Sequence, residues 1–355
     1  MNLSTAEKQQ YNRHLILEDI GLEGQLKLKQ ASVLVIGAGG LSCPVLQYLT
    51  AAGVGKIGIV DDDTVDQSNL QRQILYNHKD IGINKAEAAA AHLQLLNPFI
   101  SFDTYNTRLT KENALALFKK HSIIVDGTDN FPTRYLINDA AVMLNRPVVF
   151  GSVFKFEGQV SVFNYRNGPT YRCLYPTPPK SNEVPNCSEI GVLGVLPGII
   201  GSFQANEVLK IILGLGNVLS GKLLTLNALS MQQLLFSFGR NSSMSIDALQ
   251  DDYETFCGMP KAVKEISFEE YKAQASHFNL LDVRTQTERD EFHIESIHIP
   301  LAELALRVHE IPQDKSLLVF CKSGVRGKLA IEILQNNGFK ETLVNLKDGL
   351  LNGAL

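Results

Sequence analysis

The stretch 31–61, ASVLVIGAGGLSCPVLQYLTAAGVGKIGIVD, constrains the fold more than any other part of the chain. It contains an apolar strand, a glycine-rich turn (Gly37, Gly39, Gly40), an apolar helix, and a second apolar strand that ends at Asp61. Such glycines allow a tight turn and the close approach of a phosphate, which the following helix N-terminus attracts. A carboxylate after the second strand can accept hydrogen bonds from ribose hydroxyls. The pattern predicts the first β-α-β unit of a nucleotide-binding sheet; a tight glycine turn in another α/β protein is the alternative.

Length and composition limit the other possibilities. The chain has 355 residues, which is long for one domain and sufficient for two. Hydrophobic residues make up 45% and charged residues 20%, and the net charge of −4 gives no reason to expect nucleic acid or an anionic membrane as a partner. The most apolar stretches, around 191–203 and 208–215, are short and interrupted by Pro197, Lys210 and glycines. They predict buried helices and no membrane span.

The cysteines and the N-terminal residues bear on the compartment. Five scattered cysteines, an odd number, do not form the framework of a disulfide-rich fold. The opening MNLSTAEKQQYNRH is polar where a secretory signal would be apolar. We therefore expect a cytoplasmic protein in which each thiol is a possible reagent.

The order of predicted strands and helices indicates an α/β protein of two domains. Residues 1–240 predict a Rossmann-like, doubly wound, mostly parallel sheet, and the alternation in 147–165 predicts an antiparallel extension of it. Residues 241–261 are polar and irregular and are expected to form a linker. A smaller α/β domain is expected over 262–355, beginning with a helix in KEISFEEYKAQ.

Polar residues gather after the strands of the first domain, at the edge where doubly wound sheets bind ligands. A dinucleotide oxidoreductase needs the glycines and one acid, and it has no evident use for the rest. An adenylating enzyme also needs cations to neutralise a triphosphate and a carboxylate to hold Mg²⁺. Lys85, in the first turn of a predicted helix, is mildly unfavourable there unless it binds an anion. The candidate nucleotide-binding residues are Gly37, Gly39, Gly40, Asp61, Asp63, Asn69, Arg72, Lys85 and Asp129.

Four segments together resemble a known family: GAGGLS, VDDDTVDQSNLQRQ, GINKAEAA and DGTDNFPTR. They are similar to the ATP-dependent adenylyltransferases of the MoeB/ThiF type, which activate ubiquitin-like sulfur carriers, including molybdopterin-synthase adenylyltransferase and its thiamine-pathway relative. The resemblance covers about residues 5–258. It implies that the C-terminal Gly-Gly carboxylate of a carrier protein attacks ATP, giving an acyl-adenylate and pyrophosphate.

The same resemblance implies roles for single residues. Asp61 would bind the ribose, Asp129 would bind Mg²⁺, and the phosphates would lie against Asn69, Arg72 and Lys85. Arg13, in YNRH, resembles the arginine that reaches the triphosphate bound by the partner subunit of a homodimer. Taken without that resemblance, Arg13 is more simply a charge on a solvated helix face.

The chain departs from the family pattern in its glycines and cysteines. Ser42 replaces the last glycine of GxGGxG, and we expect little consequence because serine is small. Many relatives bind a structural Zn²⁺ through two C-x-x-C pairs, of which only Cys173 and Cys257 remain here. Two thiolates do not make a closed four-ligand site, so we expect no zinc. Cys187, in PNCSEIGV, matches a loop cysteine that links covalently to the carrier in some members, and both a catalytic and an incidental role stay open.

A further motif, CKSGVR, lies between a predicted strand and a predicted helix. At such a turn Cys321 would be surrounded by backbone N–H groups, with Arg326 close by, and these stabilise a thiolate or persulfide. With NLLDVRTQTERDEFHIESIHIPL and LKDGLLNGAL, residues 262–355 resemble a rhodanese domain along their full length. The four residues between the cysteine and the arginine suit a terminal sulfur better than a phosphate, and Asp282 and Arg284 match the loop-supporting DVR motif.

Taken together, these features predict a fused enzyme. One domain would make the carrier acyl-adenylate, and the other would deliver sulfur from a Cys321 persulfide, charged by a persulfide or thiosulfate donor, to give a thiocarboxylate. Fusion raises the donor's effective concentration. The alternatives are an NAD-dependent oxidoreductase and a non-catalytic scaffold that docks a carrier. Whether the product serves molybdopterin or thiamine synthesis stays open.

Overall fold

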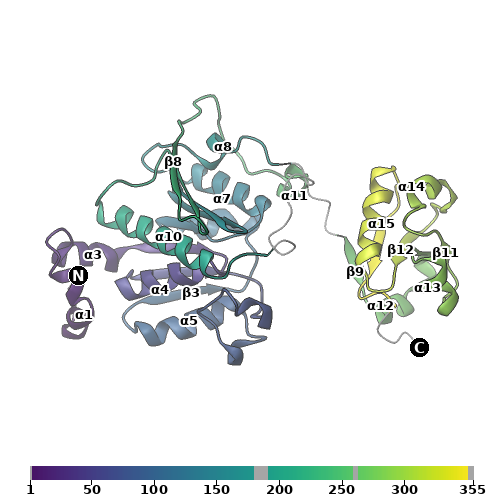
Figure 1. The fold of residues 1–355 in the computed structure, drawn as a ribbon, viewed down its shortest axis with the longest axis horizontal. Helices are drawn as coiled ribbons and strands as arrows, with labels where there is room; N and C mark the ends of the chain where they lie inside the picture. The colour runs from purple at the N-terminus through teal and green to yellow at the C-terminus, as the bar shows by residue number, and fades with distance from the viewer. Residues whose placement is uncertain (1, 180–190, 259–262, 351–355) are drawn as a thin grey trace. The chain divides into compact units, whose positions relative to one another are not determined.

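The computed structural model of the chain describes residues 2–179, 191–258 and 263–350. Contacts divide the chain into two compact units, residues 1–258 and 259–355, each with its own sheet (Figure 1). Residues 251–257, which fall in the expected linker, pack within the first unit. None of the helices in the described ranges is both long and apolar enough to span a bilayer.

The first unit contains an eight-stranded sheet in the order β3-β2-β1-β4-β5-β6-β7-β8. The strands from β3 to β5 are parallel, and those from β5 to β8 are antiparallel. The prediction of a doubly wound sheet with an antiparallel extension is therefore confirmed. The strands are β1 (Ser32–Ile36), β2 (Lys56–Val60), β3 (Ser101–Tyr105), β4 (Ile123–Asp126), β5 (Val148–Phe154), β6 (Glu157–Phe163), β7 (Lys222–Asn227) and β8 (Gln233–Ser237).

Helices connect the parallel strands. Because parallel crossovers are right-handed, α4 and α5 lie on one face of the sheet and α6 and α7 on the other. The contacts agree: α4 packs against α5 and α10, and α6 packs against α7. The helices are α1 (Thr5–Gln10), α2 (Asn12–Leu15), α3 (Gly21–Gln30), α4 (Ser42–Ala52), η1 (Gln67–Asn69), η2 (His78–Asp80), α5 (Lys85–Leu96), α6 (Lys111–Lys119), α7 (Phe131–Met143), α8 (Tyr171–Leu174), α10 (Val195–Leu213) and α11 (Tyr253–Phe256).

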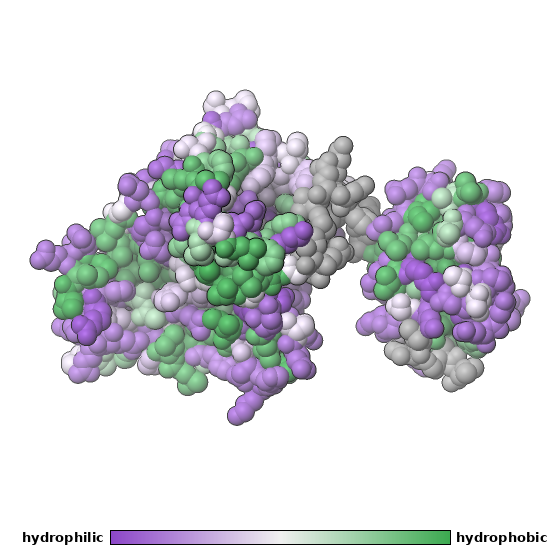
Figure 2. All heavy atoms as spheres, in the orientation of Figure 1, coloured by the Kyte–Doolittle hydropathy of each residue, from purple (hydrophilic) through white to green (hydrophobic). Residues whose placement is uncertain are grey.

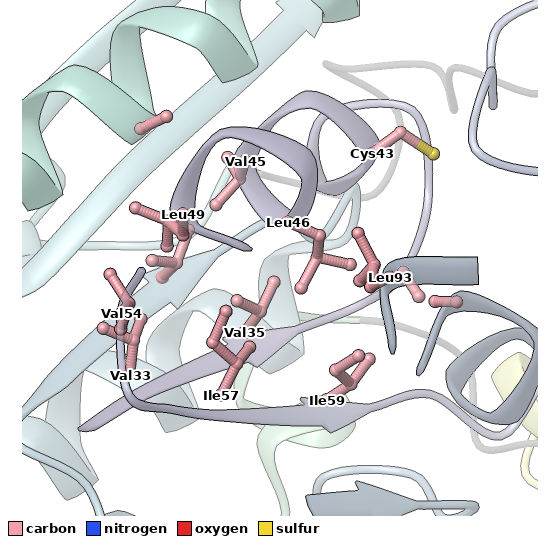
Figure 3. Close-up of a cluster of buried hydrophobic side chains, with 14 of the residues drawn as sticks. Val33, Val35, Cys43, Val45, Leu46, Leu49, Val54, Ile57, Ile59 and Leu93 are labelled. Carbon is pink, nitrogen blue, oxygen red and sulfur yellow. The ribbon is translucent and has the colours of Figure 1, made fainter. Parts of the chain in front are cut away.

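The main core lies between α4 and strands β1 and β2. Figure 3 shows Leu46 and Leu49 of α4 directed toward Val35 of β1 and Ile57 of β2. All four side chains are fully buried, and each such burial stabilises the fold by about 1.5–3 kcal/mol. This packing fixes the glycine-rich turn between β1 and α4, since both elements that flank it are anchored in the core.

The second unit contains a five-stranded parallel sheet in the order β11-β10-β12-β13-β9. The expected helix KEISFEEYKAQ is wrong at its start, because residues 264–266 pair with β13 as an edge strand and Ser267 then caps the helix. The elements are β9 (Lys264–Ile266), α12 (Phe268–Ala273), η3 (Ala275–His277), β10 (Phe278–Asp282), α13 (Gln286–Glu291), β11 (Ile297–His298), α14 (Leu304–Arg307), η4 (Val308–Glu310), β12 (Ser316–Phe320), α15 (Val325–Asn336) and β13 (Leu343–Leu346).

Candidate active sites

The glycine-rich turn is held by Asp61 as well as by its own glycines. Gly37 has φ +81°, and a Cβ there would lie 3.2 Å from the carbonyl oxygen of Gly127. The backbone N–H of Ala38 donates to Asp61 Oδ2 at 2.6 Å, and that of Asp63 donates to Oδ1 at 2.9 Å. Burial raises the pKa of Asp61, and these two hydrogen bonds oppose the shift. A carboxylate has about four acceptor positions, so Asp61 keeps capacity for a ribose hydroxyl.

Lys85 begins α5 with its side chain buried, and its Nζ lies 2.9 Å from Asp63 Oδ2. Asn84 caps the same helix and donates to the carbonyl oxygens of both Asp61 and Asp63 at 3.0 Å. The cap therefore ties the carboxylate-bearing loop to the helix that carries Lys85. A lysine held at the glycine turn, with an exposed carboxylate as its partner, is available to an incoming phosphate.

Arg72 lies beside the glycine turn. A Cβ on Gly40 would be 3.4 Å from Arg72 Cγ, and Arg72 Nη1 donates to the carbonyl oxygen of Ser68 at 3.2 Å. Asn69 is partly engaged, because its Oδ1 accepts from the N–H of Asp66 at 3.2 Å in the cap of η1. The structure thus brings Arg72 to the turn and gives Asn69 a local structural role.

Asp129 lies on the loop after β4, next to the glycine turn through the Gly37–Gly127 contact. Its neighbour Asp126 is buried and accepts from the N–H and Oγ1 of Thr128, whereas Asp129 is exposed and has no hydrogen-bond or ion-pair partner among the described residues. The buried guanidinium of Arg134 donates to the carbonyl oxygen of Thr128 at 2.9 Å and braces this loop. Asp129 is therefore free to hold a ligand.

Acidic side chains that could share a cation are adjacent in sequence. Within the described ranges, the single group of three close enough to do so is Asp61, Asp62 and Asp63. Asp129 is not in that group.

Arg13 is exposed on the short helix α2 and has no hydrogen bond or ion pair to the described residues. Its helix is fixed by its neighbours: Asn97 Nδ2 donates to Tyr11 Oη at 2.8 Å, and His14 Nδ1 lies 3.0 Å from Gln25 Oε1. Arg13 is thus presented to the outside by a well-anchored helix. Cys187 lies outside the described residues.

The two cysteines considered for zinc have different surroundings. Burial raises the pKa of the Cys257 thiol to about 12, against the opposing effect of Arg172. Burial also acts to raise the pKa of Cys173, but hydrogen bonds from Thr170 and from the N–H of Asn241 outweigh it, and the pKa falls. Within the part of the chain that the structure describes, neither cysteine belongs to a group of three potential metal ligands.

In the second unit, Cys321 directly follows β12 and precedes the loop that starts α15. Its thiol is free and its side chain is buried. Arg326, at the start of α15, donates from Nη1 and Nη2 to the two carboxylate oxygens of Glu288 at 2.7 and 2.6 Å. The bonds to Glu288 raise the pKa of Arg326, whereas burial acts to lower it. The adjacent Cys321 also raises this pKa. The same bonds lower the pKa of Glu288 to about 2.

The chain segment after β13 braces this loop. Gly349 has φ +61°, and a Cβ there would lie 2.4 Å from the carbonyl oxygen of Cys321. The N–H of Leu350 donates to that same oxygen at 3.0 Å. Asp282 and Arg284 form a buried pair, with Arg284 Nη2 2.8 Å from Asp282 Oδ2. Arg284 Nη1 also donates to the carbonyl oxygen of Glu288 at 3.2 Å, and the Glu288 carboxylate binds Arg326, so the support of the loop by the DVR motif stays a prediction.

Comparison with known proteins decides the family. The ThiF family model matches residues 11–245, and the rhodanese-like domain model matches residues 261–353. The chain belongs to the ThiF family. Its second unit is a rhodanese-like domain, so the predicted adenylyltransferase and sulfurtransferase parts are confirmed as domains.

Two relatives match along nearly the whole chain, and a third matches along part of it. The ThiF-family chain is 40% identical over 370 residues to the probable adenylyltransferase/sulfurtransferase MoeZ of Mycobacterium tuberculosis, covering 99% of this chain and 94% of that protein. It is 41% identical to the adenylyltransferase and sulfurtransferase MOCS3 of Xenopus laevis, over 95% and 83% of the two chains. It is 48% identical over 270 residues to the sulfur carrier protein adenylyltransferase of Thermus thermophilus, covering 73% of this chain and all of that protein.

Solved structures agree on the fold. A crystal structure of Escherichia coli MccB with MccA-N7isoASN superposes with a TM-score of 0.59 and 22% identity, covering 72% of this chain and 76% of that one. At this identity the likeness supports the fold alone.

Ser42, which replaces the last motif glycine, is accommodated by a glycine on a facing strand end. Its Oγ is buried, and a Cβ on Gly127 would lie 2.0 Å from it. Because Gly127 has no side chain, the Ser42 side chain fits between the start of α4 and the end of β4. A glycine at position 42 would allow the same close packing of helix and strand. The contact between Ser42 and Gly127 could not be predicted from the sequence alone, because the two positions lie far apart along the chain.

Gly349→Ala is expected to reduce sulfur transfer at least tenfold, since the new methyl group would overlap the backbone of the Cys321 loop and strain φ. Gly338→Ala is a matched control, because Gly338 also has positive φ (+77°) but a methyl group there would meet no atom of the described residues within 4 Å. Sulfur transfer from thiosulfate to cyanide by the two variants measures the difference. Equal losses in both would show that backbone strain, and not the loop contact, is responsible.

Proposed function

We propose that this ThiF-family chain adenylates the C-terminal carboxylate of a ubiquitin-like sulfur carrier with ATP, and that Cys321 then supplies sulfur to form a thiocarboxylate. The observation that carries the proposal is that one chain holds both sites. The first is a glycine turn with the buried Lys85 beside it, and the second is a buried cysteine between a strand and a helix N-terminus. The names of the relatives support the same pair of activities.

In the adenylation step, the carrier carboxylate attacks the α-phosphorus of ATP, and the bond to the pyrophosphate oxygen breaks. Lys85 and Arg72 neutralise the charge that develops on the phosphates. Asp61 holds the ribose while it fixes the glycine turn through Ala38. Mg²⁺ in such sites binds through one or two carboxylates together with phosphate oxygens. The exposed Asp129 fits that requirement, and Mg²⁺ there would neutralise phosphate charge.

In the sulfur-transfer step, the terminal sulfur of a Cys321 persulfide attacks the acyl carbon and displaces AMP. The product is an acyl disulfide between the carrier and Cys321. A second thiol then attacks the Cys321 sulfur, releasing the thiocarboxylate and leaving a disulfide. Persulfide and thiosulfate are both possible sources of the sulfur on Cys321.

An exposed apolar surface supports a protein substrate. On β8 the side chains of Leu234, Leu235 and Phe236 are 45–52% exposed, and Phe154 and Phe156 at the β5–β6 turn are also exposed. Figure 2 shows hydrophobic side chains at the surface over β8. Apolar patches of this kind mark protein interaction sites. We propose that the carrier docks here.

Exposed apolar side chains also lie near Arg13 in the chain, and they support a homodimer in which Arg13 reaches the partner's ATP. Ile16, Leu17 and Leu22, on or near α2, are 61%, 52% and 52% exposed. We propose that this face pairs with a second copy of the chain. The four cysteines in the described ranges are free thiols, which fits a reducing, cytoplasmic setting.

Action of Arg13 across the dimer predicts complementation. Arg13→Ala and Asp129→Ala chains should each be inactive, and a mixture after subunit exchange should regain about a quarter of the wild-type activity. Half of the dimers are then mixed, and each has one intact site. Differently tagged chains establish that mixed dimers form. Absence of recovery in such dimers would show that Arg13 acts within its own subunit.

Carrier-dependent exchange of pyrophosphate into ATP tests the proposed adenylation. Exchange with a molybdopterin-pathway or thiamine-pathway carrier would identify the pathway. Binding of NAD but not ATP would favour the oxidoreductase alternative, and carrier binding without any exchange would favour the scaffold. The named relatives are adenylyltransferases and support neither alternative.

A further inference from the structure

One buried carboxylate joins three elements at the end of the first unit. Arg172 of α8 donates from Nε and Nη2 to Asp139 Oδ1 and Oδ2 of α7, each at 2.7 Å. Tyr253 of α11 donates its hydroxyl to Asp139 Oδ2, also at 2.7 Å. The side chains of Asp139 and Arg172 are 0% and 9% exposed. Short, charge-assisted bonds in such a buried place are the strong kind, and removing one partner is costly.

Aromatic rings enclose the guanidinium. The guanidinium carbon of Arg172 lies 4.9 Å from the ring centroid of Tyr135 and 4.6 Å from that of Phe256. The Tyr135 and Phe256 rings are 5.3 Å apart, edge to face. Desolvated cation–π contacts are the strongest of their class. Since Phe256 and Tyr253 both belong to α11, this short helix is held by two independent kinds of contact.

The ionic contacts at the surface contribute less. Arg108 Nη2 lies 2.9 Å from Glu254 Oε1, and Lys111 Nζ lies 3.4 Å from Asp251 Oδ1. Arg108 and Lys111 are 56% and 40% exposed, and exposed pairs of this kind contribute little to stability. The residues of both pairs line one open pocket at the surface. The buried cluster therefore determines whether α11 stays docked.

The same cluster leaves no suitable place for a zinc ion. Cys257 follows α11 directly and lies near the positive charge of Arg172, which repels a cation. Glu254, three residues before it, pairs with Arg108. Asp139 already accepts three hydrogen bonds from Arg172 and Tyr253. A closed zinc site needs four ligands, and these residues do not supply them.

We propose that Asp139, Arg172 and Tyr253 form a metal-free anchor that holds α11 to α7 and α8 and thereby keeps the tether to the sulfurtransferase domain short. With the anchor in place, residues 259–263 separate the two units up to β9. Without it, the free segment would extend back to residue 242 and comprise residues 242–263, because Phe238, Arg240 and Asn241 keep hydrogen bonds of their own to the first unit. Effective concentration falls with about the −3/2 power of tether length, so release would lower it about tenfold. This last consequence rests on the proposed function, and the anchor itself does not.

Tyr253→Phe in the full-length chain is the test, because it removes one hydroxyl and keeps the ring. The amides of Phe256 and Cys257, which bond within α11, should exchange hydrogen roughly ten- to a hundredfold faster in this variant. Two controls should keep the hydrogen-exchange rates of these amides within about threefold of wild type. They are Lys111→Ala, which breaks only a surface pair, and the double variant Cys173→Ala/Cys257→Ala. Wild-type protein should contain far less than one zinc per chain, and a chelator should leave the exchange unchanged.

Retention of one zinc per chain would overturn the proposal. Unchanged amide hydrogen exchange in Tyr253→Phe would also overturn it. So would an increase in amide hydrogen exchange in the cysteine variant as large as that in Tyr253→Phe. For the tether, Tyr253→Phe should keep carrier-dependent pyrophosphate exchange and lose up to about tenfold in thiocarboxylate formation. Unchanged sulfur transfer despite a released α11 would overturn the tether consequence. Absence of pyrophosphate exchange in wild type would instead count against the proposed function and leave the anchor tested by hydrogen exchange and zinc content.

Discussion

Replacing Cys321 by alanine is expected to abolish thiocarboxylate formation while leaving pyrophosphate exchange within about twofold of wild type. The thiol lies in the second unit, whereas the glycine turn, Lys85 and Arg72 all lie in the first. The Cys321 side chain is the one sulfur next to Arg326 and the start of α15 in the described residues, so its loss removes the sulfur carrier of the reaction. Measuring exchange and thiocarboxylate in the same preparation separates the two half-reactions.

Two other cysteine variants make the comparison specific. Cys43→Ala removes a buried thiol from α4, whose pKa burial raises to about 12, so it should affect stability more than sulfur transfer. Cys187→Ala should abolish neither half-reaction completely. If Cys321→Ala still forms thiocarboxylate at the wild-type rate, sulfur reaches the adenylate from another protein or as free sulfide.

Asp129→Ala is expected to lower carrier-dependent pyrophosphate exchange by about a hundredfold or more, because Mg²⁺ loses its protein ligand and phosphate charge is less well neutralised. Folding should be unaffected: the carboxylate is exposed and has no hydrogen-bond or ion-pair partner among the described residues. The loop itself is held by Asp126, Thr128 and Arg134, which the substitution leaves in place.

Asp62→Ala is the matched control for this variant. Asp62 is also an exposed carboxylate at the edge of the sheet, and it belongs to the group of three acids that could share a cation. If Asp129 holds Mg²⁺, Asp62→Ala should keep exchange within a few-fold of wild type. A large loss of pyrophosphate exchange with Asp62→Ala and none with Asp129→Ala would show instead that the metal binds at residues 61–63.

The sequence predicted the parts of the fold that depend on local pattern. The β-α-β unit at 31–61, the parallel order and the antiparallel extension follow from hydrophobic periodicity and glycine spacing, and each is present. The edge strand β9 was missed because three residues of an amphipathic segment give no periodicity. The exposure of β8 does not follow from its sequence, because a short apolar run is typical of a buried strand.

Most of the predicted site residues lie around the two expected loops, whereas Arg13 lies on α2 and Cys187 lies outside the described residues. The residues that support the loops could not be identified from the sequence. The capping role of Asn84 could have been predicted, because an asparagine before a helical pattern is a typical N-cap. Glu288 and Gly349 were not, since each meets the Cys321 loop from a distant part of the chain. The Asp139 cluster joins residues more than 30 and more than 110 positions apart. Such long-range partners depend on tertiary packing, which one sequence does not specify locally.

The most direct test of the account is the mass of the carrier after one complete reaction. The full-length chain is incubated with a candidate carrier, ATP, Mg²⁺, a thiol, and thiosulfate or a protein persulfide, and the carrier is then weighed by mass spectrometry. The account predicts a carrier in which one sulfur has replaced one C-terminal oxygen, and its formation should require both ATP and Cys321. A carrier that stays unmodified or stops at the adenylate with every sulfur donor, although the chain exchanges pyrophosphate, would contradict the claim that this one chain carries out both steps.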